Sequence, residues 1–373
     1  MTMPFGSEGV SDEIGIALSG GGFRATLFHV GAFRRLVELG ILTRLGRISS
    51  ISGGSINAGR LAQVWDELAA SPTVANYEAL VGEPLRDFCR RSIDARAGIE
   101  GLLSPWTSAG AEIEKEYARH VVSKTLDQLP DSPVFVFGAT NMQTGRSFRF
   151  SKKYMGDWRI GLADNPSLPI ARAVAASSAF PPVLSPVVIK NPGTFRAVEG
   201  ADLAGNRAYT RTLYLTDGGV YDNLGLEPVW KRCGTVLASD AGAPFALNET
   251  ANTDLLRQTM RALDIATDQS RGLRQRVLVD EFKRGLRKGA YWGIDTAIGA
   301  YGLADSLTCK PERVQALASI RTRLNPFTDQ EQGELINWGY ALTDAAIRKY
   351  APQLVASGAP PPAWPEPRWR LDR

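Results

Sequence analysis

Two glycine-rich turns near the start of the chain contain residues that suit acyl-transfer chemistry. The first is Ser19-Gly20-Gly21-Gly22-Phe23-Arg24, and the second is Ser50-Ile51-Ser52-Gly53-Gly54. Each turn follows a short apolar run and precedes a helix-like pattern, and the exposed N–H groups at the start of a helix stabilise an anion. The pair therefore predicts an oxyanion site beside a nucleophile.

Ser52 is the predicted nucleophile. It follows a strand-like run and precedes a helical pattern, and its neighbours Ser50, Gly53 and Gly54 are small. A strained strand-to-helix turn that exposes a hydroxyl needs small neighbours, usually in the pattern Gly-x-Ser-x-Gly. Ser50 stands where that pattern has its first glycine. A serine in this setting is also commonly an ordinary turn residue or helix N-cap, and that alternative stays open.

The first turn supplies the predicted oxyanion donors, which are the backbone N–H groups of Gly20, Gly21 and Gly22 together with that of Gly53. One such donor contributes about 3–4 kcal/mol to transition-state stabilisation. The alternative is a dinucleotide-binding loop, because Gly20-x-Gly22-x-x-Ala25 fits the relaxed fingerprint. That loop requires a ribose-binding carboxylate after the second strand, where this chain has a serine. The sequence therefore favours the oxyanion site.

The base that would activate the serine is predicted to be a carboxylate. The chain has only two histidines, His29 in an apolar helical stretch and His120 in a charged one, and neither follows a strand. Both are therefore expected to be structural. Asp217 ends an apolar run and precedes Gly218 and Gly219, so it is the best-placed carboxylate to accept a proton. Asp-Gly is also a common turn dipeptide, which is the plainer interpretation.

Four sequence blocks occur in the order typical of the patatin-like phospholipases, and the chain resembles that family from Ile14 to Asp240. The blocks are Ser-Gly-Gly-Gly-x-Arg, the serine-centred turn, Ala-Ser-Ser-Ala-Phe-Pro-Pro at 176–182, and Asp-Gly-Gly. The resemblance implies a serine–aspartate dyad without histidine, in which Ser52 is the nucleophile and Asp217 the base. It implies that Gly20 to Gly22 form the oxyanion loop. Two further residues match common family positions: Arg24, expected to steady the turn or the charge, and Asn223.

The resemblance makes the expected function a serine lipid acyl hydrolase of the phospholipase A type, which cleaves fatty-acyl esters of membrane phospholipids and requires neither a metal ion nor a cofactor. The expected location is the cytoplasm, with transient contact at membrane surfaces. The alternative is a regulated effector of the same fold that stays silent until a partner or a signalling nucleotide binds. A regulatory ligand or a homo-oligomer would then provide the control.

Strand-like runs alternate with helix-like segments, which predicts a three-layer α/β/α fold with a mostly parallel sheet. Strands are expected at 14–18, 48–51, 134–139, 212–216 and 235–239. Open α/β sheets place their sites at the carboxyl ends of such strands. The organisation is expected to comprise a catalytic core at 14–245, a helical extension without clear strands at 246–350, and a proline-rich tail at 351–373 that wraps the surface or is partly disordered.

The composition is that of a soluble globular protein, with 44% apolar and 22% charged residues among 373. The net charge of +4 is too small to indicate nucleic-acid binding. Cys89, Cys233 and Cys309 are far apart, which predicts reduced thiols, a cytosolic setting and no cysteine-ligated metal. Residues 1–13 lack the pattern of a signal peptide, and no run is apolar enough to span a bilayer. Any action on membranes is therefore expected to be peripheral.

Residues 271–288 combine seven basic side chains with apolar ones. Leu273, Val277, Phe282 and Leu286 are spaced so that they would form a stripe along a helix. A basic amphipathic helix of this kind lies at a membrane interface beside anionic headgroups. The plainer alternative is a surface helix whose apolar stripe packs on the core.

Overall fold

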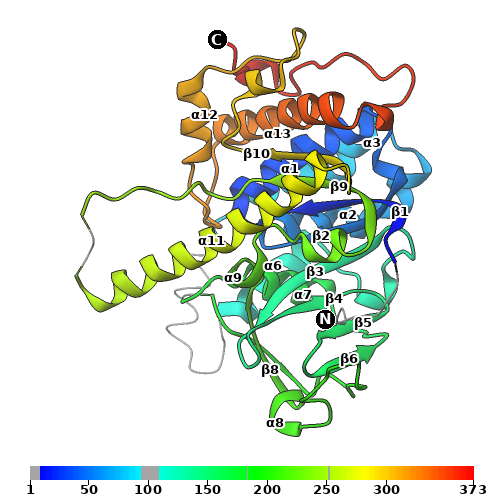
Figure 1. The fold of residues 1–373 in the computed structure, drawn as a ribbon, viewed down its shortest axis with the longest axis vertical. Helices are drawn as coiled ribbons and strands as arrows, with labels where there is room; N and C mark the ends of the chain where they lie inside the picture. Colours follow the sequence, from blue (N-terminus) through cyan, green and yellow to red (C-terminus); the bar gives the residue numbers. More distant parts are fainter. Residues whose placement is uncertain (1–8, 94–108, 183, 251–252) are drawn as a thin grey trace.

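One mixed β-sheet forms the centre of the molecule (Figure 1). The computed structural model describes residues 9–93, 109–182, 184–250 and 253–373, and within these ranges ten strands join the sheet. They are β1 Ser11–Leu18, β2 Leu45–Ser50, β3 Val134–Asn141, β4 Arg146–Phe150, β5 Tyr154–Asp157, β6 Gly161–Asp164, β7 Val187–Lys190, β8 Thr212–Asp217, β9 Cys233–Asp240 and β10 Lys288–Gly293. The signal-peptide expectation concerns a segment of which residues 1–8 lie outside the described ones.

The sheet has a parallel core with an antiparallel extension. Its order is β10-β9-β1-β2-β3-β4-β5-β6. From β10 to β3 all neighbours are parallel, whereas β3 to β6 are antiparallel. β8 runs antiparallel beside β3, and β7 antiparallel beside β8. The five strands predicted from the sequence are therefore present, and four of them belong to the parallel core.

Helices cover both faces of this sheet (Figure 1). The longer ones are α1 Gly22–Glu38, α2 Gly53–Ala70, α4 Glu83–Cys89, α6 Ala109–His120, α7 Ile170–Ser178, α11 Leu255–Lys283, α12 Pro311–Ala318 and α13 Asp329–Tyr350. The short ones are α3 Val74–Tyr77, α8 Arg207–Thr210, α9 Gly219–Asp222 and α10 Glu227–Trp230, with single turns η1 Leu42–Arg44, η2 Glu78–Gly82, η3 Leu126–Gln128, η4 Ile298–Tyr301, η5 Pro352–Leu354 and η6 Pro367–Trp369.

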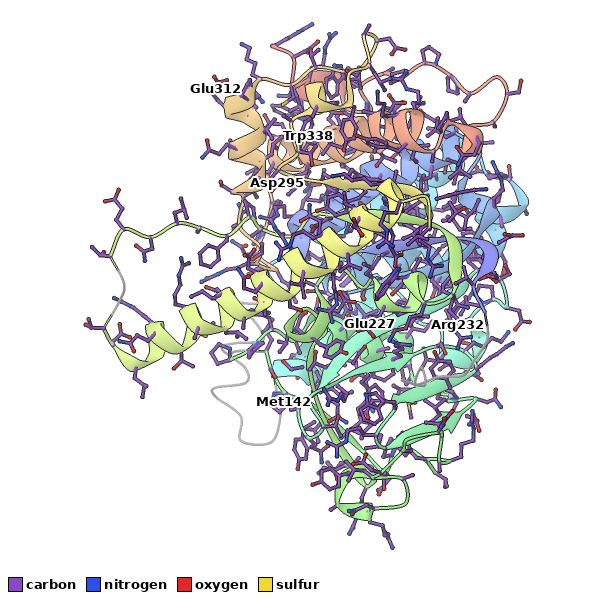
Figure 2. All side chains as sticks on the ribbon, viewed as in Figure 1. Met142, Glu227, Arg232, Asp295, Glu312 and Trp338 are labelled. Atoms are coloured by element: carbon purple, nitrogen blue, oxygen red, sulfur yellow. The ribbon has the colours of Figure 1, made fainter. Side chains whose placement is uncertain are left out.

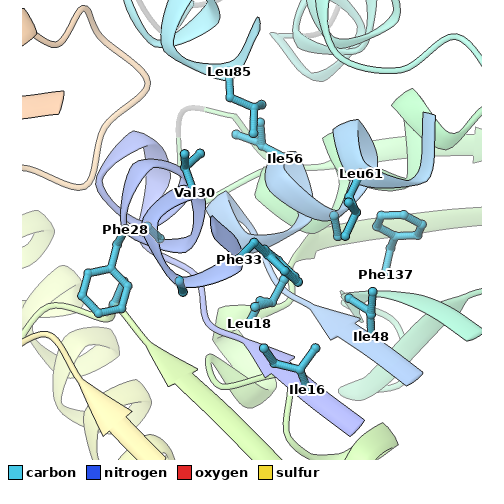
Figure 3. Packing of buried hydrophobic residues seen from close by; sticks show 14 of the residues in the cluster. Ile16, Leu18, Phe28, Val30, Phe33, Ile48, Ile56, Leu61, Leu85 and Phe137 are labelled. Carbon is cyan, nitrogen blue, oxygen red and sulfur yellow. The ribbon is translucent and has the colours of Figure 1, made fainter. Parts of the chain in front are cut away.

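Alternation along β1 explains why the molecule has a core on each side of the sheet. Ile16 and Leu18 belong to the large cluster formed with α1, α2, α7 and α13, part of which is seen in Figure 3. Ala17 belongs to a smaller cluster with Val229 of α10 and Leu278 of α11. Successive strand residues point to opposite faces, so a strand covered on both sides is apolar throughout. The predicted three-layer α/β/α architecture is confirmed.

The strands β2 and β8 meet end to end along β3. β2 pairs with the first half of β3, where Ser50 lies opposite Phe137, and β8 pairs with the second half, where Asp217 lies opposite Ala139. Because β2 is parallel to β3 and β8 antiparallel to it, the carboxyl ends of β2 and β8 face each other. The sequence predicted the strand at 212–216 but not its reversed direction, which depends on pairing with a distant strand.

The C-terminal part of the chain is built into the same body. β10 pairs with β9, and α13 packs along α1. Trp338 of α13, labelled in Figure 2, donates its indole N–H to the carbonyl of Ile294 at 2.7 Å. The prediction that 246–350 lacks strands is therefore wrong, because pairing with β9, rather than a local apolar pattern, makes Lys288–Gly293 a strand.

The proline-rich tail packs against the helices. Leu371 is fully buried, and Trp364 is 9% exposed. The carbonyl of Pro360 accepts a hydrogen bond from the guanidinium of Arg35 in α1 at 2.9 Å. The tail therefore contributes to the packing around α1 and α13.

The long helix α11 is anchored by its second half, and its first half projects beyond the body of the molecule (Figure 1). Ser270 donates to the Tyr221 carbonyl at 3.1 Å, and Arg271 forms an ion pair with buried Asp240 at 3.7 Å. Leu278 is fully buried, whereas Leu255 is 83% exposed. Within the described residues, no helix has the length and apolar character needed to cross a membrane.

The stripe predicted at 271–288 is divided between two environments. Leu273 and Val277 are exposed, whereas Phe282 packs against the smaller core cluster. The helix ends at Lys283, so Leu286 lies beyond it. Neither predicted alternative therefore holds for the whole segment, because Leu273 and Val277 face solvent whereas Phe282 packs on the core.

We predict that alanine at Gly31 or Gly339 destabilises the protein. A Cβ on Gly31 would lie 1.8 Å from the Ile336 carbonyl oxygen, and one on Gly339 would lie 1.9 Å from that of Phe28. Helices α1 and α13 would have to separate, and overpacking of this kind costs about 1–3 kcal/mol. Thermal unfolding should show a lower Tm for both variants.

The matched control for these variants is Gly299→Ala. A Cβ at Gly299 would have no described atom within 4 Å. Its Tm should stay at the parental value. Parental Tm values for both Gly31→Ala and Gly339→Ala would contradict the close contact between α1 and α13.

Candidate active site

Ser52 occupies the turn between β2 and α2 in a strained conformation. Its φ of 50° and ψ of −118° lie in a region that non-glycine residues rarely adopt. Its N–H donates to Ser177 Oγ at 2.9 Å, and the residue is 8% exposed. Strain of this kind persists only where the surroundings enforce it, and it concentrates at functional sites.

The two glycines that follow Ser52 allow neighbouring backbones to approach this turn closely. A Cβ on Gly53 would lie 2.1 Å from the carbonyl oxygen of Gly22, and one on Gly54 would lie 2.7 Å from that of Leu18. The two glycine turns of the sequence are therefore in direct contact, with the start of α1 against the start of α2.

Ser50 is the residue that departs from the Gly-x-Ser-x-Gly pattern, and its side chain has partners. It is fully buried, its Oγ accepts from Ser55 Oγ at 3.0 Å, and it donates to the Val136 carbonyl across 3.5 Å. A hydroxyl is thus accommodated where the pattern has glycine, because a buried hydrogen-bond network receives it.

Asp217 lies at the end of β8, facing the end of β2. Its carboxylate accepts from the Gly219 N–H at 2.7 Å, and the residue is 2% exposed. Burial raises the pKa of Asp217 to about 7, although the hydrogen bonds from Gly219 and from the Ser52 side chain lower it. The carboxylate is therefore poised to exchange a proton near neutral pH, beside the predicted nucleophile.

The first glycine turn differs in one respect from the prediction. The N–H of Gly20 donates to the carbonyl of Asn223 at 3.0 Å, so it has no proton left for an oxyanion. The predicted role of Gly20 as a donor is therefore wrong. Gly20 instead leaves room for its neighbours, because a Cβ there would lie 2.4 Å from Asn223 Oδ1 and 3.0 Å from Ser52 Cβ.

The remaining predicted donors have free N–H groups. Gly21 and Gly22 have φ values of 139° and 55°, which suit glycine. Within the described part of the chain, no acceptor bonds the N–H of Gly21, Gly22 or Gly53. These three groups stand at the starts of α1 and α2, where the helix dipole also favours negative charge.

Arg24 ties the glycine turn to distant parts of the chain. Its guanidinium donates to the carbonyls of Ala241, Ala318 and Ile320 at 2.6–3.2 Å. Burial lowers the pKa of Arg24 to about 10, which still leaves it charged at neutral pH. Its observed contacts are with backbone carbonyls, so it steadies the turn.

Asn223 packs among glycines that follow Asp217. A Cβ on Gly219 would lie 2.7 Å from Asn223 Oδ1, and one on Gly218 would lie 2.5 Å from the carbonyl oxygen of Gly138. The space around Asp217 therefore excludes larger residues at 218 and 219. Asn223 fills the volume that Gly219 and Gly20 leave open.

The two histidines lie in structural roles. His29 is fully buried, and its Nε2 lies 3.0 Å from the carbonyl of Ser19, while its Nδ1 lies 3.0 Å from Ser239 Oγ. Since a carbonyl can only accept, Nε2 carries the proton. Burial lowers the pKa of His29 to about 4, so it stays neutral. His120 lies on α6, 3.7 Å from Glu116.

Ser177 was not predicted to have a role at the site, although it lies in the sequence block at 176–182. This residue contacts the Ser52 N–H directly. The signal available was a polar Ser-Ser pair ending an otherwise apolar helical run.

The three cysteines are free thiols, and among the described residues no cluster of three or more His, Cys, Asp or Glu side chains is arranged to hold a metal ion.

Solved structures with a similar overall fold include a human phospholipase and a bacterial protein. A structure of human GIVD cytosolic phospholipase A2 aligns with a TM-score of 0.50 and 11% identity, over 90% of this chain and 58% of that protein. Its complex with methyl gamma-linolenyl fluorophosphonate aligns with a TM-score of 0.48 and 14% identity, over 89% and 57%. VipD from Legionella pneumophila aligns with a TM-score of 0.42 and 14% identity, over 91% and 67%.

The chain thus spans a little over half the length of the human protein, and this likeness concerns the fold. No curated protein sequence matches the chain significantly. The family model for patatin-like phospholipase matches residues 16–230, which include both glycine turns, the segment at 176–182 and Asp217. Because that match covers well over half of its residues, the chain belongs to the patatin-like phospholipase family.

Proposed function

We propose that the protein is a serine lipid acyl hydrolase that cleaves fatty-acyl esters of membrane phospholipids, with Ser52 as nucleophile and Asp217 as base. Family membership supports lipid acyl hydrolysis. The observation that carries the assignment of residues is the meeting of β2 and β8, which brings a strained serine against a buried carboxyl whose pKa is about 7.

In the proposed reaction, Asp217 transfers one proton in each of two half-reactions. The Asp217 carboxylate accepts the Ser52 Oγ proton as the oxygen attacks the ester carbonyl, and the proton then passes to the departing alcohol. Asp217 next takes a proton from water, which attacks the acyl-enzyme and releases the fatty acid, and the proton returns to Ser52. Each attack passes through a tetrahedral intermediate with a negatively charged oxygen. The free N–H groups of Gly21, Gly22 and Gly53 would stabilise that oxygen in both.

We also propose that the protein contacts membranes through the outward face of α11. Leu255, Leu273 and Val277 are 83%, 60% and 42% exposed on this helix. Arg276 and Lys283 are exposed there as well. An apolar helical face flanked by cations suits the interface of an anionic bilayer, and Leu273 and Val277 are exposed even though their half of α11 is anchored to the body.

We predict that Ser52→Ala abolishes hydrolysis and that Asp217→Asn slows it. Mass spectrometry of products from mixed phospholipid vesicles should detect no released fatty acid with Ser52→Ala. Asp217→Asn should reduce the rate by about 10²–10⁴-fold, the usual contribution of a general base. Labelling of Ser52→Ala by a fluorophosphonate probe at the parental rate would overturn the assignment of the nucleophile.

We predict that activity rises with pH through about 7, because Asp217 accepts a proton only when ionised and its pKa is about 7. The value of kcat/KM should increase about tenfold per pH unit below the midpoint and level off above it. A soluble short-chain thioester, with its products separated by chromatography, avoids effects of pH on vesicles. A flat or falling profile between pH 5 and 8 is incompatible with this base.

We predict that Leu273→Asp combined with Val277→Asp weakens binding to anionic phosphatidylglycerol vesicles. Each fully buried apolar side chain contributes about 1.5–3 kcal/mol, so the loss should reach at least about tenfold in a sedimentation assay. Turnover of the soluble thioester should stay parental. Val10→Asp is the matched control, since Val10 is 51% exposed at the start of β1. Equal binding by the double variant and the control would contradict the docking face.

A further inference from the structure

We infer that Ser177 is a positioning residue that holds the Ser52 turn and the Asp217 turn in register, an inference that rests on the proposed function. It lies at the end of α7 and is fully buried. It forms no part of the proposed proton path. Its effect on catalysis would pass through the backbone of the two catalytic residues.

A gap lies where the carboxyl ends of β2 and β8 meet along β3. Pairing with β3 leaves backbone groups at the two strand ends without strand partners, and buried N–H groups require acceptors. The end of α7 supplies them on both sides. Ser177 Oγ accepts from the Ser52 N–H at 2.9 Å, and the Ser177 carbonyl accepts from the Gly218 N–H at 3.2 Å.

Ala179, in the same segment, holds the end of β8 that carries Asp217. The Ala179 carbonyl accepts from the Asp217 N–H and from Thr216 Oγ1, both at 2.9 Å. Ser177 therefore binds the nucleophile's turn through its side chain and the base's turn through its main chain. Any displacement of this residue changes the distance between Ser52 and Asp217.

The hydroxyl groups around Ser177 have only one consistent hydrogen-bond direction. Ser55 Oγ donates to Ser50 Oγ at 3.0 Å, so across the 2.9 Å contact between Ser177 and Ser55 the proton comes from Ser177. A hydroxyl has one proton to donate. The Ser177 oxygen is thus left as an acceptor for the Ser52 N–H, and the chain ends at the Val136 carbonyl.

The direction of these hydrogen bonds matters because the backbone of Ser52 is strained. A non-glycine residue in a sparsely populated backbone region costs about 1–3 kcal/mol and persists only when its surroundings enforce it. The acceptor at Ser177 fixes the direction of the Ser52 N–H and therefore the peptide plane before the nucleophile. Without it, a buried N–H would lack a partner, and relaxation of the turn would move Oγ away from the carboxyl.

The test compares Ser177→Ala with its neighbour Ser178→Ala. Ser178 is 3% exposed, and its Oγ donates to the Val174 carbonyl at 2.8 Å and accepts from Tyr117 at 2.9 Å, which places its bonds within α7 and to α6. Loss of either hydroxyl should lower Tm to a similar degree. Loss at Ser177 alone should affect the reacting groups.

Three measurements distinguish positioning from general stability. With the soluble thioester, Ser177→Ala should reduce kcat by about 10–100-fold, as expected for a misplaced reacting group, with KM within about twofold. Its rate of fluorophosphonate labelling at Ser52 should fall in parallel. The pH midpoint of kcat/KM should move upward, since the Ser52 hydroxyl lowers the pKa of Asp217. Ser178→Ala should keep kcat and midpoint near the parental values.

The inference would be overturned if Ser177→Ala and Ser178→Ala had equal kcat, labelling rate and pH midpoint. That result would leave the proposed function of the parental protein intact. A parent that is not labelled at Ser52 would instead refute the proposed function, and the inference with it. Ser177→Cys provides the same comparison if Ser177→Ala does not fold, because a thiol keeps the volume and accepts hydrogen bonds poorly. Parental kcat in that variant would also count against the role of Ser177.

Discussion

The end-to-end meeting of β2 and β8 along β3 is the constraint on which the rest of the site depends. Two strands of opposite direction share one side of β3, with Ser50 opposite Phe137 and Asp217 opposite Ala139. Residues that follow these ends must share a small volume, and this explains the crowding at Gly218, where a Cβ would lie 2.5 Å from the Gly138 carbonyl. It also explains why a third segment, the end of α7, has to supply hydrogen-bond acceptors to both strand ends.

The place where β2 and β8 meet is enclosed with the help of residues far outside 16–230, the range that the family model matches. The Gly22 turn is covered by the chain at 322–323, because a Cβ on Gly22 would lie 2.0 Å from the Thr322 carbonyl oxygen. Arg24 bonds the carbonyls of Ala318 and Ile320, and α13 packs along α1. The C-terminal part of the chain thus holds the Gly20–Gly22 turn in place beside the Ser52 turn, and so belongs to the structural unit of the candidate site.

Local turns were predictable from the sequence, and long-range pairing was not. The strained turn at Ser52 could be predicted because such a turn needs small residues at fixed spacing. Asp217 became the candidate base because histidine is scarce and because it follows an apolar run, and its role stays a prediction. The direction of β8 and the existence of β10 depend on partners far along the chain, so no local pattern encodes them. The donor role expected of Gly20 failed for the same reason, since the carbonyl that takes its proton belongs to Asn223.

The burial of the junction also explains how one carboxylate could take the place of a histidine. An aspartate in water has a pKa near 4 and is a poor base at neutral pH, whereas burial raises the pKa of Asp217 to about 7. The same burial has the opposite effect on His29, whose pKa falls to about 4, so that it remains a neutral hydrogen-bond partner beneath the glycine turn. In a dry site, the carboxyl is therefore the group with a pKa suited to proton exchange, and the imidazole is suited to structure. A change that admitted water to the junction would remove this advantage even with Ser52 and Asp217 intact.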